Sequence, residues 1–332
     1  MTGYERIMNT IEGKPVDHTP VWPFVMTFAA KYGGVPYGAF ASDHREMAKA
    51  LIKTAEDFDL DGITVDSDAY REATACGAQI VYPYDDLPYL NANAITEKEK
   101  FFFQQPVIEN CPRLIDKIEG VRRVKEYFKE DKAVAGWIEA PLQCAGTLYP
   151  MDEFMTDIYE DPHFIEELVN FTTELGTAFA VEQVKAGADI IGIGDAMASL
   201  VSPAVYEEYF LPATKKLVQE IRKKVKVKLK YHICGQSTHL LKYSEEIGFD
   251  IVNIDYLVDM DTAVGMVHGK TTIKGNINPV TLLTQTPEKI SEICRGLLTQ
   301  AANQKFILSP GCEVAKNTPV ENMRALVQST RI

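Results

Sequence analysis

The sequence predicts an α/β protein built as a (β/α)8 TIM barrel with an insertion between strands 2 and 3. Short runs rich in β-branched and other apolar residues recur along the 332-residue chain, eight in all, and long helical stretches separate them. Because the runs are almost continuously apolar, they indicate parallel strands covered on their outer face. We expect residues 1–332 to form a single TIM-barrel catalytic domain.

Helical stretches separate the predicted strands, and the longest gap between strands follows the second. This gap predicts extra structure, such as a lid or a subunit contact. An open doubly wound sheet is the alternative fold, but no glycine-rich phosphate loop follows the first strand, which weakens a dinucleotide-binding interpretation. The eight predicted strands are 19–26, 61–66, 133–140, 188–195, 227–234, 249–255, 271–277 and 305–311.

Helix-start signals support the alternation. Ser42 precedes a stretch with apolar residues at helical spacing and is the predicted cap of that helix. Asp161, Ser202 and Thr286 are each followed by proline, so each predicts an N-cap with proline at the first helical position.

Composition argues against several functional classes. The formal net charge is −13, and an acidic surface repels nucleic-acid phosphates and anionic lipids, so we expect neither partner. The opening "MTGYERIMNTIEGKP" lacks the pattern of a secretory signal, and no run of about 18 apolar residues predicts a membrane span. We therefore expect a cytoplasmic protein whose six cysteines are reduced.

A histidine and two cysteines fall at predicted strand ends. A parallel barrel places its active site at the C-terminal ends of its strands. His232 and Cys234 end the fifth predicted strand and, two positions apart, face the same side, while Cys312 follows the eighth in "SPGC". Three convergent ligands of this type, with a fourth position open, are typical of a catalytic zinc site.

Other interpretations of "YHICG" are core packing, a redox pair and a nucleophile with its base. A redox CxxC motif is absent. A Cys/His nucleophilic pair leaves Cys312 without a role. His239 falls on the predicted following helix, where an ordinary helix position explains it. Core packing stays open as the alternative to a metal site.

Further polar residues end other predicted strands or follow them closely. We expect Glu139 and Asp195 to be catalytic, either orienting His232 or holding substrate, and Asp66, Tyr70 and Asn276 to line a substrate pocket. The alternative for each is a solvated or helix-capping role.

Several motifs resemble a known family. "GYERIMNTIEGKPVDHTPVWPF", "GDAMASLVSPAVYEEYFLPATKKL" and "IKGNINP" resemble the uroporphyrinogen decarboxylase superfamily along nearly the whole chain. "HICG" and "SPGCEVAKNTPVENMRALV" resemble the His-x-Cys…Cys zinc signature of its corrinoid-dependent, methylcobamide:coenzyme M-like methyltransferase branch. The resemblance implies a (β/α)8 barrel and zinc ligation by His232, Cys234 and Cys312.

The resemblance also implies an activity. It predicts methyl transfer between the corrinoid (cobalamin) of a separate corrinoid protein and a small substrate, either a thiol such as coenzyme M or an O-methyl donor such as a methoxylated aromatic. A decarboxylase of the parent superfamily, or a binding subunit whose metal site is structural or lost, are the alternatives. Decarboxylases of the family resemble one another in an arginine-bearing stretch after the first strand, whereas "VMTFAAKYGGVPYG" offers only Lys31.

Overall fold

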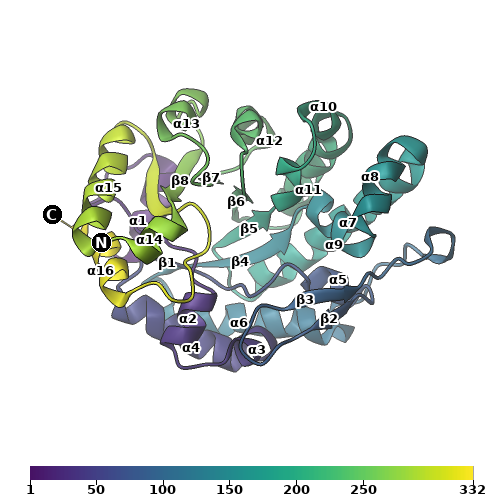
Figure 1. Cartoon of the computed structure of the whole chain (residues 1–332), viewed down its shortest axis with the longest axis horizontal. Coiled ribbons are helices and arrows are strands. Elements are labelled where there is room, and N and C mark those ends of the chain that lie inside the picture. The colour runs from purple at the N-terminus through teal and green to yellow at the C-terminus, as the bar shows by residue number, and fades with distance from the viewer. Residues whose placement is uncertain (332) are drawn as a thin grey trace.

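A curled parallel sheet forms the centre of the molecule, and helices surround its outer face in the computed structural model, which describes residues 1–331 (Figure 1). Within these residues the sheet has seven strands in the order β1-β4-β5-β6-β7-β8-β9, all parallel. Each matches a predicted strand. Their bounds are β1 Gly62–Thr64, β4 Ala133–Glu139, β5 Ile190–Gly194, β6 Lys228–Ile233, β7 Ile251–Ile254, β8 Thr272–Ile277 and β9 Phe306–Pro310.

The first predicted strand, residues 19–26, does not form a regular strand. It makes isolated parallel bridges from Val21 to Leu308 and from Phe24 to Glu313, and the backbone N–H of Asp61 donates to the Val21 carbonyl (3.0 Å). The segment therefore lies between β9 and the start of β1. Its two prolines, at positions 20 and 23, have no N–H to donate, which explains why no continuous ladder forms. The α/β class is confirmed; the closed eight-stranded barrel is not.

Helix starts follow the predicted signals with one correction. Asp161 and Thr286 accept the backbone N–H three residues on, as N-caps do. Asp43, not Ser42, caps α4, because the Ser42 hydroxyl donates to the Gly38 carbonyl instead (2.6 Å). The helices are α1 Gly3–Glu12, α2 Thr27–Tyr32, α3 Tyr37–Ser42, α4 His44–Asp57, α5 Arg71–Ala75, α6 Pro112–Phe128, α7 Pro141–Leu148, α8 Met151–Glu160, α9 Pro162–Lys185, α10 Pro203–Val205, α11 Leu211–Lys224, α12 Ser244–Ile247, α13 Met260–Met266, α14 Pro279–Thr284, α15 Pro287–Gln300 and α16 Val320–Gln328.

The long segment between β1 and β4 carries its own small sheet. Antiparallel strands β2 (Gln79–Val81) and β3 (Tyr89–Ala92) pair with each other and with no strand of the central sheet. They lie at the lower right of Figure 1, near α5. Helix α6 then returns the chain to β4.

Apolar packing closes the N-terminal end of the sheet. Trp22 is fully buried there with Ile7 and Ile11 of α1, against the first residues of several strands. A larger apolar cluster fills the space between the sheet and the outer helices. The C-terminal ends of the strands are therefore the end at which polar chemistry can gather. Within the described residues, no helix has both the length and the apolar character needed to cross a membrane.

Candidate metal centre

The three predicted metal ligands meet at the C-terminal end of the sheet. His232 is buried near the end of β6, Cys234 directly follows that strand, and Cys312 follows β9. Nε2 of His232 lies 3.2 Å from Sγ of Cys234, and this sulfur lies 3.6 Å from Sγ of Cys312. One donor atom from each residue fits within 4.8 Å of the others. We call these three residues the metal-ligand cluster.

The donor set of this cluster fits zinc. In a tetrahedral site with Zn–S bonds of about 2.3 Å, two sulfurs stand about 3.8 Å apart, close to the observed separation of Cys234 and Cys312. The imidazole of His232 is also correctly turned: Nδ1 faces the backbone carbonyl of Asn253 (3.2 Å), which leaves Nε2 toward the sulfurs. Such a carbonyl partner commonly fixes the orientation of a metal-binding histidine.

Two glycines allow the cysteines to reach these positions. Gly235 has a φ of +86°, in the left-handed region that other residues rarely adopt, and it turns the chain directly after Cys234. A Cβ on Gly311 would collide with the backbone nitrogen of Tyr256, so glycine lets the end of β9 approach the loop after β7. The sequence therefore folds locally to bring Cys312 beside β6.

The two thiols share one hydrogen bond. The Cys234 thiol next to Cys312 lowers the pKa of Cys312, and the same contact raises the pKa of Cys234, to which burial and the charges of Asp255 and Glu139 add. One sulfur is thus favoured as a thiolate while the other keeps its proton. Binding of a cation between them would release that proton.

Glu139 ends β4 near the metal-ligand cluster. Its Oε1 accepts the Trp137 indole N–H (3.0 Å), and its backbone N–H donates to Oε1 of Glu72 (2.9 Å). Burial raises the pKa of Glu139 well above its ordinary value, and the charges of Glu72 and Asp66 add to this effect. These surroundings favour the protonated form of the Glu139 carboxyl.

The carbonyl of Asn253, and not the side chain of Asp195, faces Nδ1 of His232, while the backbone N–H of Asp195 donates to the His232 carbonyl (2.9 Å). The two predicted roles of Asp195, orienting His232 or holding substrate, stay predictions. The carboxylate of Asp195 accepts a hydrogen bond from the hydroxyl of Tyr231 (2.6 Å). That hydroxyl lies 3.1 Å from the hydroxyl of Tyr206. Burial raises the pKa of Asp195 to about 7.

The three predicted pocket residues have different surroundings. The carboxylate of Asp66 accepts a hydrogen bond from Nζ of Lys117 (2.7 Å) and forms an ion pair with the buried Arg71. The Asn276 amide donates to the backbone carbonyls of Asp255 (3.2 Å) and Val258 (2.6 Å), so it anchors the loop after β7. Tyr70 is half-buried ahead of α5, and burial raises the pKa of its hydroxyl.

Asp66 belongs to a buried set of opposite charges. Arg71 and Arg113 both pair with Asp68. Burial alone would raise the pKa of Asp68, but these two guanidinium groups lower it. We call these residues the charged network: Asp66, Asp68, Arg71, Arg113 and Lys117.

Two residues near the metal-ligand cluster were not among the predicted site residues. Asn253 lies on β7, opposite His232 in the strand register, and Lys274 lies opposite Asn253 on β8. Each is a polar residue in the middle of a buried strand, "FDIVNID" and "TTIKGNI". That interruption of an apolar run was the available signal.

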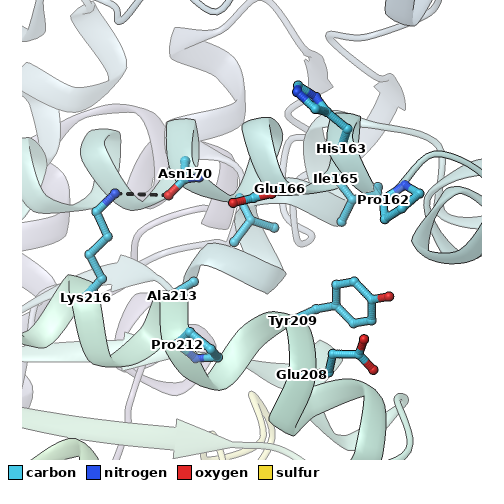
Figure 2. Close-up of a pocket in the computed structure, with 11 residues that line it drawn as sticks. Pro162, His163, Ile165, Glu166, Asn170, Glu208, Tyr209, Pro212, Ala213 and Lys216 are labelled. Carbon is cyan, nitrogen blue, oxygen red and sulfur yellow. Dashed lines mark hydrogen bonds between the residues drawn. The ribbon is translucent and has the colours of Figure 1, made fainter.

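A separate groove runs between α9 and α11 on the outside of the fold (Figure 2). It has a volume of about 580 Å³, and across it Nζ of Lys216 donates to Oδ1 of Asn170 (3.0 Å). No residue of the metal-ligand cluster lines it. The chemistry therefore gathers at the sheet end and not in this groove.

Comparison with known proteins identifies the family. The sequence profile of the uroporphyrinogen decarboxylase (URO-D) family matches residues 2–331. The chain belongs to this family.

Members of the URO-D family with different activities resemble the chain to a similar degree. Methylcobamide:CoM methyltransferase MtbA of Methanosarcina acetivorans is 26% identical, over 100% of this chain and 99% of the relative. A uroporphyrinogen decarboxylase of Koribacter versatilis is 25% identical, over 95% and 92%. A solved methyltransferase structure from Methanosarcina mazei superposes with a TM-score of 0.89 at 23% identity, covering 99% of this chain and 98% of its own, which shows a shared fold.

Proposed function

We propose that the protein is a zinc-dependent methyltransferase that moves a methyl group between a corrinoid carried by a separate protein and a small thiol such as coenzyme M. The observation that carries this proposal is the metal-ligand cluster: a histidine and two cysteines within 4.8 Å at the C-terminal end of the sheet. The relatives named as methylcobamide:CoM methyltransferases support the choice of methyl donor and acceptor. The proposal treats residues 1–332 as one catalytic domain, with 19–26 in the place of an eighth barrel strand.

The residues of this chain have distinct parts in the proposal. His232, Cys234 and Cys312 hold the metal. When bound there, zinc lowers the pKa of a thiol substrate and keeps its sulfur in the nucleophilic thiolate form. Two thiolate ligands leave the centre less electrophilic, which suits transfer to sulfur. Glu139 holds or accepts a proton beside this position, and Tyr70 contacts the substrate. We assign Asp66 and Asn276 to anchoring the surrounding loops, and Asp195 to the packing behind β6.

Exposed apolar side chains support a protein partner over this end of the sheet. Leu200 follows β5, Tyr256 and Leu257 follow β7, and Val280 follows β8, and all four are exposed. Large exposed apolar side chains that gather around one site are typical of protein interfaces. A corrinoid protein docked here would bring its cofactor to the metal-ligand cluster.

A second candidate function is removal of a methyl group from an ether such as a methoxylated aromatic. The feature in its favour is the Glu139 carboxyl at the end of β4: burial raises its pKa well above its ordinary value, which favours a protonated carboxyl that can give its proton to a leaving alkoxide or phenolate. The same site would then serve the reverse direction of methyl flow.

Decarboxylation of a substrate with many carboxylates is the less favoured alternative. Such a substrate needs cationic partners, preferably arginine. The stretch after Phe24 contains no arginine before position 38, and Nζ of its one lysine, Lys31, donates to Oδ1 of Asn317 (2.7 Å).

A single set of assays tests these activities. Purified protein is analysed for zinc and then supplied with methylcobalamin and 2-mercaptoethanesulfonate, or with reduced cobalamin and methoxylated aromatics. We expect stoichiometric zinc and turnover with the thiol. Zinc-loaded protein that turns over neither pair, with and without added corrinoid protein, would refute the methyltransferase proposal. Turnover only of the ether would select the second candidate.

A further inference from the structure

Lys274 is a wholly buried lysine in the middle of β8. Its Nζ donates to Oδ1 of Asn253 on β7 (2.6 Å) and to Oγ of Ser309 on β9 (2.7 Å). Among residues 1–331 it forms no ion pair with a carboxylate. A buried amino group is costly unless hydrogen-bond partners satisfy it, and these two acceptors from neighbouring strands do so.

Both acceptors of Lys274 lead directly to metal ligands. The backbone carbonyl of Asn253 faces Nδ1 of His232, and the Asn253 amide lies 3.5 Å from the carbonyl of Gly311, the residue before Cys312. Ser309 precedes Cys312 by three positions on the same chain segment. One amino group thus connects the strand that orients His232 with the strand that delivers Cys312.

We propose that Lys274 is a positioning residue of the metal centre: its amino group fixes His232 through Asn253 and Cys312 through Ser309. This inference rests on the proposed function only in assuming that the metal-ligand cluster binds a metal. It assigns no contact between Lys274 and the substrate.

The test measures metal binding directly, so it does not depend on turnover. Lys274→Met keeps the length of the side chain and removes its amino group with both hydrogen bonds. We expect its affinity for Zn²⁺, measured by competition with a chelator, to fall about 10- to 100-fold, as it does when groups that support metal ligands are removed. We also expect the thiolate-to-metal absorption of the Co²⁺-loaded variant to shift, because the geometry at Cys312 relaxes.

Lys117→Met is the matched control. Lys117 is an equally buried lysine, but its Nζ donates to Asp66 in the charged network. We expect this variant to lose stability and to keep its Zn²⁺ affinity within about twofold. If Lys274→Met binds Zn²⁺ as the wild type does, or if Lys117→Met loses as much affinity, the positioning role is wrong.

Ser309→Ala keeps the inference testable if Lys274→Met does not fold. It removes one acceptor of Lys274 and leaves the lysine in place. We expect a smaller loss of Zn²⁺ affinity, about 2- to 10-fold, which corresponds to one hydrogen bond. In that case an unchanged affinity would overturn the inference. Failure of the methyl-transfer assays with wild-type protein would refute the proposed function without altering these binding results.

Discussion

Two groups of ionisable side chains lie at the C-terminal end of the sheet, and they differ in how their charges are satisfied. In the charged network, on the β1 side, Asp66 and Asp68 are each paired with two cations. In the metal-ligand cluster, on the β6–β9 side, one donor atom from each of three residues lies within 4.8 Å of the others. The comparison teaches that buried charges paired with one another stabilise the fold, whereas a histidine and two cysteines turned toward one point have the arrangement of metal ligands.

Removal of a ligand is the strongest way to test this difference. We expect Cys312→Ser to abolish stoichiometric zinc binding, because two remaining ligands cannot hold the ion tightly. Cys294→Ser is the control: Cys294 is fully buried in α15 and is not one of the three clustered donors, and we expect this variant to bind zinc normally. Metal analysis after dialysis measures both. Full zinc occupancy in Cys312→Ser would show that the cluster is not the metal site.

The charged network should respond in the opposite way. Arg71 is wholly buried and pairs with Asp66 and Asp68, so Arg71→Met leaves two carboxylates short of one cation. We expect it to lower the free energy of unfolding by about 3–5 kcal/mol. Chemical denaturation measures this loss, and a chelator competition should give a zinc affinity within about twofold of the wild type. A stable variant with weakened zinc binding would mean that the network serves the site.

Sequence reasoning found the metal-ligand cluster because its signal was local and chemical. His232 and Cys234 stand two positions apart at a strand end, and parallel strands bring all their C-terminal ends together, so Cys312 could be placed beside them. The fold class and seven strands followed from the same alternation. The prediction of a first strand was wrong because it relied on the apolar residues of 19–26 and neglected the two prolines. Proline has no N–H to donate to a neighbouring strand, so this segment forms only isolated bridges.

Side-chain partners could not be predicted in this way. Asp195 and Asn276 stand at strand ends like His232, yet one accepts a tyrosine hydroxyl and the other holds a loop backbone. Those contacts depend on the register between neighbouring strands and on the direction in which each side chain points at the end of its strand. Lys274 was missed for the same reason, since its role depends on two neighbouring strands.

Asp195 offers a test that neither group should influence. Burial raises its folded-state pKa to about 7 from an ordinary 3.8, so the folded protein holds a proton that the unfolded chain releases between these values. The stabilisation that this bound proton gives the folded protein is fully present below about pH 4 and is lost as the pH rises through 7. The free energy of unfolding falls by at most about 4 kcal/mol over this range. We expect the melting temperature of Asp195→Asn to fall less than that of the wild type between pH 5 and 8. Parallel pH profiles of the two proteins would contradict this.

Asn276 provides the mildest test, because its prediction as a pocket residue and its observed contacts lead to different results. Its amide donates to the carbonyls of Asp255 and Val258, and Asn276→Ala leaves both without this donor. We expect a loss of about 1–3 kcal/mol in stability, with zinc affinity unchanged and with KM for the thiol unchanged once the protein is folded. A raised KM at unaltered stability would instead place Asn276 in the substrate pocket. The loop that Asn276 holds begins at Asp255, whose charge acts on Cys234. If Asn276→Ala changed the reactivity of the Cys234 thiol and left KM unchanged, the position of this loop would be shown to act on the metal-ligand cluster.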